Sequence, residues 1–141
     1  MSEVSAKWSE PAIRVLMMPR DTNAHGTIFG GVILSYIDQA GAIEARRQGS
    51  VFMVTVSMDK VVFHQPVFVG DVVSFWTETL RMGTTSITTK VTVEAIRGKD
   101  PNERVIVTEA VVVYVNVGPD RKPAPLKAGS TALSSSSPTV P

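Results

Sequence analysis

Apolar side chains recur every three or four positions between residues 29 and 47, a spacing that predicts a helix with one buried face. The apolar positions are Phe29, Val32, Ile33, Tyr36, Ile37, Ala40 and Ile43. Arg46 and Arg47 occupy the last turn, where positive charge offsets the helix dipole. Because polar positions are few before residue 44, we expect other parts of the fold to surround this helix.

After Gly49 the pattern changes to the two-residue period of β-strands. Strands are predicted at residues 12–17, 51–64, 71–81, 84–97 and 104–117. In the 84–97 strand one phase is apolar, which predicts one buried face; its members are Ile87, Val91, Val93 and Ala95. The 104–117 strand is apolar in both phases, as expected for a strand covered on both faces. The sequence therefore predicts an α+β fold, with a long curved antiparallel sheet of about five strands around one central helix.

Length and composition indicate one compact domain, because 141 residues with 43% hydrophobic and 19% charged residues are too apolar for a disordered chain. We place this domain at residues 11–127, after an N-terminal segment (1–10) and before a flexible Ser/Pro-rich tail (128–141). No apolar run is long enough to span a membrane, and the N-terminus has no signal-peptide pattern. We therefore expect a cytoplasmic protein without membrane insertion.

Charge and motif content argue against several functional classes. The net charge of +1 provides no broad basic surface for a nucleic acid, although single Lys or Arg side chains could hold one phosphorylated ligand. Two histidines without any cysteine argue against a zinc site and against thiolate chemistry, so no metal is expected. Neither a Gly-x-Ser-x-Gly motif nor a Gly-x-x-x-x-Gly-Lys loop is present, which argues against a serine hydrolase and a nucleotide phosphate site.

The most informative segment joins a polar loop to the start of the predicted helix. Gly30 and Gly31 leave the helix N-terminus without bulky side chains, so free N–H groups could stabilise an oxygen that gains negative charge. Asp38 adds a carboxylate about two turns further on, at about 3.6 residues per turn. A carboxylate, an amide and such a helix N-terminus are together sufficient for thioester hydrolysis. In this reaction the carboxylate acts as general base or nucleophile.

Each of these residues also has a purely structural interpretation. Asp38 could be a solvated helix residue, and Asn23 could be a turn residue that caps its own loop. Gly30 and Gly31 could serve only to let the helix pack closely against a neighbour. The residues one turn from Asp38 are small or apolar, which favours a carboxylate partly removed from water; they are Leu34, Ser35, Gly41 and Ala42.

A set of short motifs follows a known family in order and spacing from about residue 11 to residue 125. The motifs are Met18-Pro19, Asp21-Thr22-Asn23, Gly26, Phe29-Gly30-Gly31, Asp38 with Ala40-Gly41, Phe63, Pro66, Gly70-Asp71 and Gly83-Thr84-Thr85-Ser86. On these residues the chain resembles the hotdog-fold acyl-CoA thioesterases of the cytosolic acyl-CoA hydrolase type. The resemblance implies a hotdog fold and hydrolysis of fatty acyl-CoA to free fatty acid and coenzyme A, without a cofactor.

The resemblance also implies roles for individual residues. Asp38 is then the catalytic carboxylate, and Asn23 lies opposite it in the active site, the two coming from different subunits of a dimer. Gly30 and Gly31 form the oxyanion-binding start of the helix. Since a single sheet has exposed edges, we expect a dimer at least, assembled further into a hexamer (a trimer of dimers) or a tetramer.

Contacts to coenzyme A are predicted in the turn formed by Gly83, Thr84, Thr85 and Ser86, whose N–H and hydroxyl groups could bind the pantetheine or the diphosphate. Tight-turn chemistry alone explains the Gly-Thr pair equally well. Further candidate substrate-binding side chains are His25, Lys60, Arg81, Arg121 and Lys122.

Two functions from other classes remain open. One is a non-catalytic acyl-CoA binding or sensing protein, although sensors that regulate genes normally add a DNA-binding module, for which this chain has no spare length. The other is a hotdog dehydratase, which pairs a catalytic histidine with its carboxylate. Here His25 in the loop would have to serve, and the helix position of Asp38 matches the thioesterase pattern instead.

Overall fold

The computed structural model describes residues 8–126, so the predicted tail at 128–141 lies outside the described residues. The elements in chain order are β1 (Ile13–Leu16), a 3₁₀ turn η2 (Pro19–Asp21), α1 (Gly30–Arg47), β2 (Met53–Asp59), β3 (Val72–Met82), β4 (Ser86–Ile96) and β5 (Arg104–Asn116). Within the described part, no helix is long and apolar enough to cross a membrane.

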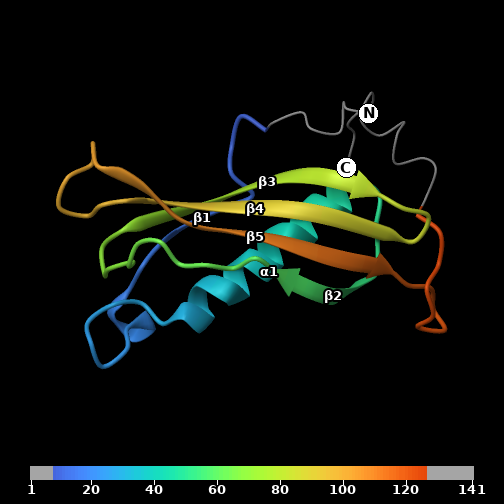
Figure 1. Cartoon of the computed structure of the whole chain (residues 1–141), viewed down its shortest axis with the longest axis horizontal. Helices are drawn as coiled ribbons and strands as arrows, with labels where there is room; N and C mark the ends of the chain where they lie inside the picture. The colour runs from blue at the N-terminus through green and yellow to red at the C-terminus, as the bar shows by residue number, and fades with distance from the viewer. Residues whose placement is uncertain (1–7, 127–141) are drawn as a thin grey trace.

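The five strands form one antiparallel sheet in the order β1-β3-β4-β5-β2, and α1 lies across one face of it (Figure 1). The helix buries Ile33, Ile37 and Ala40 against that face. In β4 the predicted apolar phase is buried as well, because successive strand residues point to opposite faces. The predicted architecture, a five-stranded antiparallel sheet on one long helix, is therefore confirmed.

Two strand predictions were wrong in part. The strand predicted at residues 51–64 ends at Asp59, because Lys60 adopts a left-handed φ of 61° that no regular strand residue has. Residues 60–71 then run as an irregular segment. β5 was predicted to be covered on both faces, but within one chain only its helix-facing side is buried, and most outward residues are half-buried or exposed.

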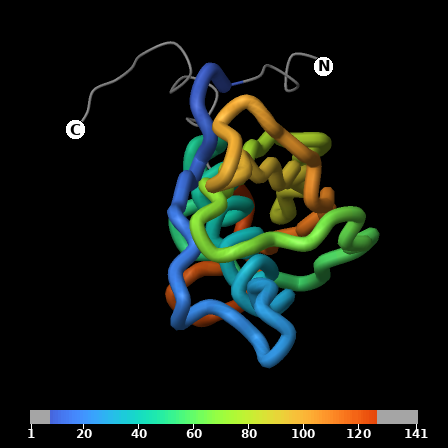
Figure 2. Tube along the Cα trace, turned by 90° about the vertical axis from the view of Figure 1, so that its left-hand side faces the viewer, coloured from blue at the N-terminus to red at the C-terminus, as the bar shows by residue number. Residues whose placement is uncertain are grey.

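Loops gather at both ends of the sheet. Figure 2 looks onto the end where α1 begins, and there the segment at residues 60–71 runs between the loop at residues 20–29 and the β4–β5 turn at residues 97–103. The opposite end carries the β3–β4 turn at residues 83–85 and the segment at residues 117–126 (Figure 1). The candidate site residues are divided between these two ends and the middle of the helix.

A buried carboxylate ties the second half of α1 to β3. Glu44 is only 1% exposed, and it accepts hydrogen bonds from Thr77 at 2.9 Å and Thr79 at 2.6 Å. The indole N–H of Trp8 donates to the same carboxylate at 2.7 Å, and the Arg47 guanidinium lies 4.1 Å above the Trp8 ring. Trp8 belongs to the segment that the sequence set apart from the domain, yet it packs on α1.

Candidate active site

Asp38 lies in the middle of α1, half-buried, with its side chain directed towards β2 and β5. Thr55 of β2 donates its hydroxyl to Asp38 Oδ1 at 2.8 Å. The hydroxyl of Tyr114 in β5 lies 2.5 Å from the Asp38 main-chain carbonyl oxygen and 3.1 Å from the same Oδ1. Asp38 is therefore held by hydroxyl donors from two strands, which does not fit a freely solvated helix residue.

The sequence interpretation missed both partners of Asp38. Thr55 and Tyr114 are directly opposite each other in the β2–β5 pairing, so their hydroxyls reach the helix side by side. Neither residue type is unusual in a strand, because threonine and tyrosine are common there. Their proximity to Asp38 follows from the register of the β2–β5 pairing, and this register could not be read from the sequence.

The helix N-terminus is open. α1 begins at Gly30, and among residues 8–126 the Gly30 and Gly31 N–H groups donate no hydrogen bond. A methyl group added at Gly31 would meet nothing within 4 Å, and one at Gly30 would make only ordinary contacts with Phe63 at 3.8 Å. Close packing within the chain therefore does not require either glycine, and the structural interpretation of these residues loses its support.

A cavity of about 310 Å³ adjoins the helix N-terminus. Gly30, Ile33 and Phe63 are among the residues that line it, together with His64 and Val67. Open N–H groups beside a partly apolar hollow can accommodate a group that has both a polar carbonyl and an apolar chain.

Asn23 is bound within its own loop. Its side-chain oxygen accepts hydrogen bonds from the N–H groups of His25 at 2.8 Å and Thr27 at 3.2 Å, and its amide donates to the Thr27 hydroxyl at 2.9 Å. Asp38 lies eight residues beyond Gly30, which is about 12 Å along a helix. Among the described residues no hydrogen bond joins Asn23 to Asp38, since the Asn23 side chain is bonded within its loop and Asp38 is bonded to Thr55 and Tyr114. His25 is exposed at the tip of the same loop.

Most predicted coenzyme A contacts lie at the opposite end of the sheet. Gly83, Thr84, Thr85 and Ser86 form the β3–β4 turn, with Arg81 just before it and Arg121 and Lys122 in the neighbouring segment, while Lys60 follows β2. The Gly83 N–H donates to the Ser86 carbonyl at 2.8 Å, and a methyl group at Gly83 would lie 2.8 Å from the Ser86 hydroxyl. The geometry of the turn is thus sufficient to explain a glycine at position 83. Within one chain, this turn and the helix N-terminus lie at opposite ends of the sheet.

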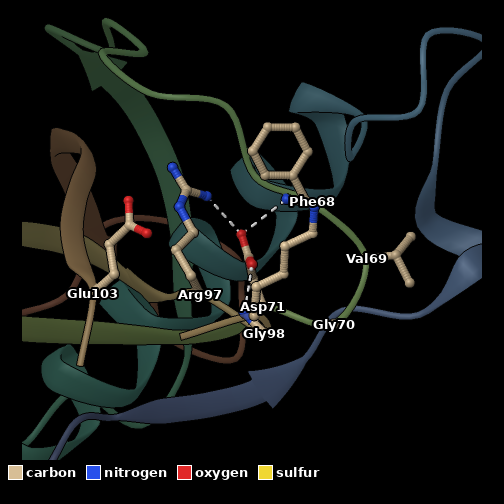
Figure 3. Close-up of a pocket in the computed structure, with 8 residues that line it drawn as sticks. Phe68, Val69, Gly70, Asp71, Arg97, Gly98 and Glu103 are labelled. Carbon is tan, nitrogen blue, oxygen red and sulfur yellow. Dashed lines mark hydrogen bonds and ion pairs between the residues drawn. The ribbon is translucent and has the colours of Figure 1, made fainter. Parts of the chain in front are cut away.

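The Gly70-Asp71 motif has a structural role beside a cavity of about 520 Å³ (Figure 3). Asp71 is 2% exposed and accepts from the Arg97 guanidinium at 2.7 Å, the Phe68 N–H at 2.9 Å and the Gly98 N–H at 3.1 Å. A methyl group at Gly98 would lie 2.7 Å from the Gly70 carbonyl oxygen. Asp71 therefore fastens the segment at residues 60–71 to the β4–β5 turn.

Replacing Asp71 with alanine is expected to lower the free energy of unfolding by about 3 kcal/mol, because the largely buried Arg97 guanidinium would lose its counter-charge. Urea denaturation followed by circular dichroism measures this change. Glu103→Ala is a matched control, since it removes an exposed carboxylate from the same cavity and should change stability by less than about 0.5 kcal/mol. Equal stability of the Asp71→Ala and Glu103→Ala proteins would contradict the fastening role.

Within residues 8–126, no group of three or more His, Cys, Asp or Glu side chains is placed to hold a metal ion. The titratable group with a large perturbation is Tyr114, because burial and then the negative charge of Asp38 raise the pKa of its hydroxyl. This hydroxyl therefore stays protonated and acts as a donor to the carboxylate. The chemistry available at the site is that of a carboxylate, two hydroxyl donors and open backbone N–H groups.

Comparison with known proteins places these features in a family context. A family model described as the thioesterase superfamily matches residues 25–101, which include the helix, the helix N-terminus and Asp38. The chain is 43% identical over 119 residues to the acyl-CoA thioester hydrolase YciA of Salmonella typhimurium, a match that covers 83% of this chain and 90% of the relative.

Solved structures agree in fold. Cj0915, a hexameric hotdog fold thioesterase of Campylobacter jejuni, is 43% identical with a TM-score of 0.81, over 89% of this chain and 96% of that one. HI0827, a hexameric broad specificity acyl-coenzyme A thioesterase solved as a mutant with one aspartate replaced by alanine, is 37% identical. Its TM-score is 0.79, and the match covers 84% of this chain and 86% of that one. The predicted hotdog fold is confirmed.

Proposed function

Because this chain belongs to the thioesterase superfamily, we propose that it hydrolyses the thioester of fatty acyl-CoA to free fatty acid and coenzyme A. The observation that carries the proposal is the half-buried Asp38 carboxylate, whose Oδ1 is held by Thr55 and Tyr114. The chain that carries this carboxylate is 43% identical in sequence to an acyl-CoA thioester hydrolase. A carboxylate held in this way can serve as general base or nucleophile in thioester hydrolysis.

In the proposed reaction, Asp38 acts as general base or as nucleophile. As a base it takes a proton from water, and the resulting hydroxide attacks the thioester carbonyl carbon. The carbonyl oxygen becomes an oxyanion that the Gly30 and Gly31 N–H groups stabilise. Because Gly30 lies about 12 Å from Asp38 along one helix, these N–H groups belong to the second subunit in the proposed site, on the same chain as the Asn23 that faces Asp38. Collapse of this intermediate breaks the carbon–sulfur bond and releases coenzyme A as thiolate, which is then protonated. As a nucleophile, Asp38 would first form an acyl anhydride, which water then cleaves. Neither route requires a cofactor.

We place each complete site between two subunits. Asn23 belongs to a loop at one end of the chain and Asp38 to the middle of the helix, so a second copy is needed to set the amide opposite the carboxylate. The open space at Gly31 supports this arrangement, because a substrate or a second chain can approach there without a clash. The remaining candidates for contact with coenzyme A are His25, Lys60, Arg81, Gly83, Thr84, Thr85, Ser86, Arg121 and Lys122.

The proposed function is tested by mixing purified protein with acyl-CoA substrates of different chain length and following free thiol with a disulfide reagent. Catalytic release of one thiol for each fatty acid formed is the expected result. Binding of acyl-CoA without thiol release would instead identify the alternative binding or sensing protein. Interconversion of hydroxyacyl-CoA and enoyl-CoA would identify the dehydratase. A cytoplasmic location, where acyl-CoA is made and used, is part of the proposal.

A homo-oligomer is expected in solution, and a hexamer in particular. β2 is an edge strand whose Val54 and Val56 are 50% and 58% exposed, and such an apolar edge favours pairing with another copy. Solved relatives are hexameric. Light scattering at micromolar concentration should give about six times the chain mass, and a monomer would contradict the shared site.

A further inference from the structure

Tyr114 places a polar group in the apolar core. It is the last buried residue on the helix-facing side of β5 and is 1% exposed, among side chains that are otherwise mainly valine and alanine. A buried tyrosine hydroxyl needs a hydrogen-bond partner, and phenylalanine would satisfy the packing without one. The hydroxyl of Tyr114 finds its partners on a single residue, Asp38, through the main-chain carbonyl and Oδ1.

Gly41 provides the space for this arrangement. It lies one turn after Asp38 on α1, and a methyl group there would overlap the Tyr114 hydroxyl and lie 2.9 Å from a ring carbon. Glycine is a poor helix former, so its presence inside α1 needs a reason. The reason is that only a glycine leaves room for the Tyr114 ring at this position. Gly31 differs, because a methyl group added there would have no neighbour within 4 Å.

The two oxygens of the Asp38 carboxylate have different surroundings. Oδ1 accepts from Thr55 and also faces the Tyr114 hydroxyl, whose single proton is shared between Oδ1 and the nearer Asp38 main-chain carbonyl oxygen; among residues 8–126, Oδ2 accepts no hydrogen bond. The two hydroxyls on the Oδ1 side restrict the orientation of the carboxylate and leave the other oxygen available. Because burial raises the pKa of Tyr114, its hydroxyl remains a donor across the working pH range.

We infer that Tyr114 is a positioning residue, which holds Asp38 through Oδ1 so that Oδ2 faces the attacking water or the thioester carbon. The inference rests on the proposed function for its kinetic consequence. Tyr114 does not touch substrate in this assignment, and it acts only through the carboxylate. Misplacement of a reacting group by about 1 Å can lower a rate by about 100-fold, so loss of the hydroxyl should be visible in kcat.

The first test is Tyr114→Phe, which keeps the ring beside Gly41 and removes one oxygen. We expect kcat to fall by roughly 10- to 100-fold with KM changed by less than about 3-fold. Tyr36→Phe is the matched control, because it removes the same atom from the other tyrosine of the chain, which packs against Phe75 at a ring distance of 5.5 Å. Tyr36→Phe should retain wild-type kcat. A wild-type kcat in Tyr114→Phe would overturn the inference.

A double variant separates positioning from a general structural effect. If Tyr114 acts through Asp38, Tyr114→Phe should change kcat by less than about 2-fold when Asp38 is already asparagine. An independent contribution would lower kcat by the same factor in both backgrounds and would contradict the inference. Should Tyr114→Phe fail to fold, Gly41→Ala displaces the hydroxyl while retaining it, and the same selective loss of kcat is expected.

Crystal structures of the wild type and of Tyr114→Phe give a readout that does not need activity. The Asp38 carboxylate should turn away from its wild-type orientation in the variant, and an unchanged carboxylate would overturn the inference. If the wild type releases no thiol from any acyl-CoA, the proposed function fails, while the crystal comparison still decides the role of Tyr114.

Discussion

Replacement of Asp38 with asparagine is expected to lower kcat for acyl-CoA hydrolysis by roughly 100-fold or more, because general-base contributions are commonly of that size. The asparagine amide has nearly the same shape and keeps an oxygen that can accept from Thr55 and Tyr114, so the fold should remain intact. Steady-state kinetics with a thiol reagent measure the loss. Circular dichroism and the urea unfolding midpoint verify that the variant is folded.

Asp59→Asn is the matched control for this experiment. Asp59 is exposed at the end of β2, so the same change of one charged oxygen to an amide should leave kcat within about 2-fold of wild type. If Asp38→Asn retained activity within a few-fold of wild type, Asp38 would be removed from the mechanism. The acyl-CoA hydrolase function could then survive, but another group would have to activate water.

Two inactive variants should restore each other if the site is shared between subunits. Asn23→Ala and Asp38→Ala proteins, each nearly inactive alone, are expected to regain activity when they are unfolded and refolded together. A mixed dimer has one site with both residues native and one with both replaced. Random mixing then restores up to about a quarter of wild-type sites under two-fold symmetry. Thiol release by the refolded mixture, compared with each variant refolded alone, measures the recovery.

The mixing experiment needs proof that mixed oligomers form. Differently tagged Asn23→Ala and Asp38→Ala chains should be purified together through both tags before the assay. Sites built within one chain would give no recovery, because every site would lack one residue whichever subunits met. Absence of recovery in tag-selected mixed oligomers would show that Asn23 and Asp38 do not complete each other across the dimer.

The helix and most strands could be predicted because each has one clear hydrophobic period. The apolar spacing predicted a helix from Phe29, and the observed helix begins one residue later, at Gly30; the alternation around Val91 predicted the buried face of β4. The end of β2 could not be predicted, since Lys60 continues a run of residues that suits a strand. Its left-handed backbone depends on where residues 60–71 must run, which is a property of the whole fold.

The candidate site could be predicted only in part. Asp38, Gly30 and Gly31 stand out in the sequence, because a carboxylate and paired glycines are unusual inside an otherwise apolar helix. Thr55 and Tyr114 do not stand out, because their meaning depends on the pairing of β2 with β5. The Gly70-Asp71 motif drew attention as a family feature, and its observed contacts are those of a structural ion pair with Arg97.

The two hydrogen bonds that hold Asp38, one from Thr55 and one from Tyr114, come from strands that should differ in how often they open. Tyr114 belongs to β5, which is bonded to strands on both sides, whereas Thr55 belongs to β2, which is bonded to β5 alone. Edge strands open locally at a lower free energy than central strands. Each such opening would remove the Thr55 hydrogen bond and leave that of Tyr114 in place, so we expect the carboxylate to exchange between a state held by both hydroxyls and a state held by Tyr114 alone. A neighbouring copy that seals the β2 edge would lengthen the state held by both hydroxyls, and assembly would then govern how much of the time each subunit is competent for turnover.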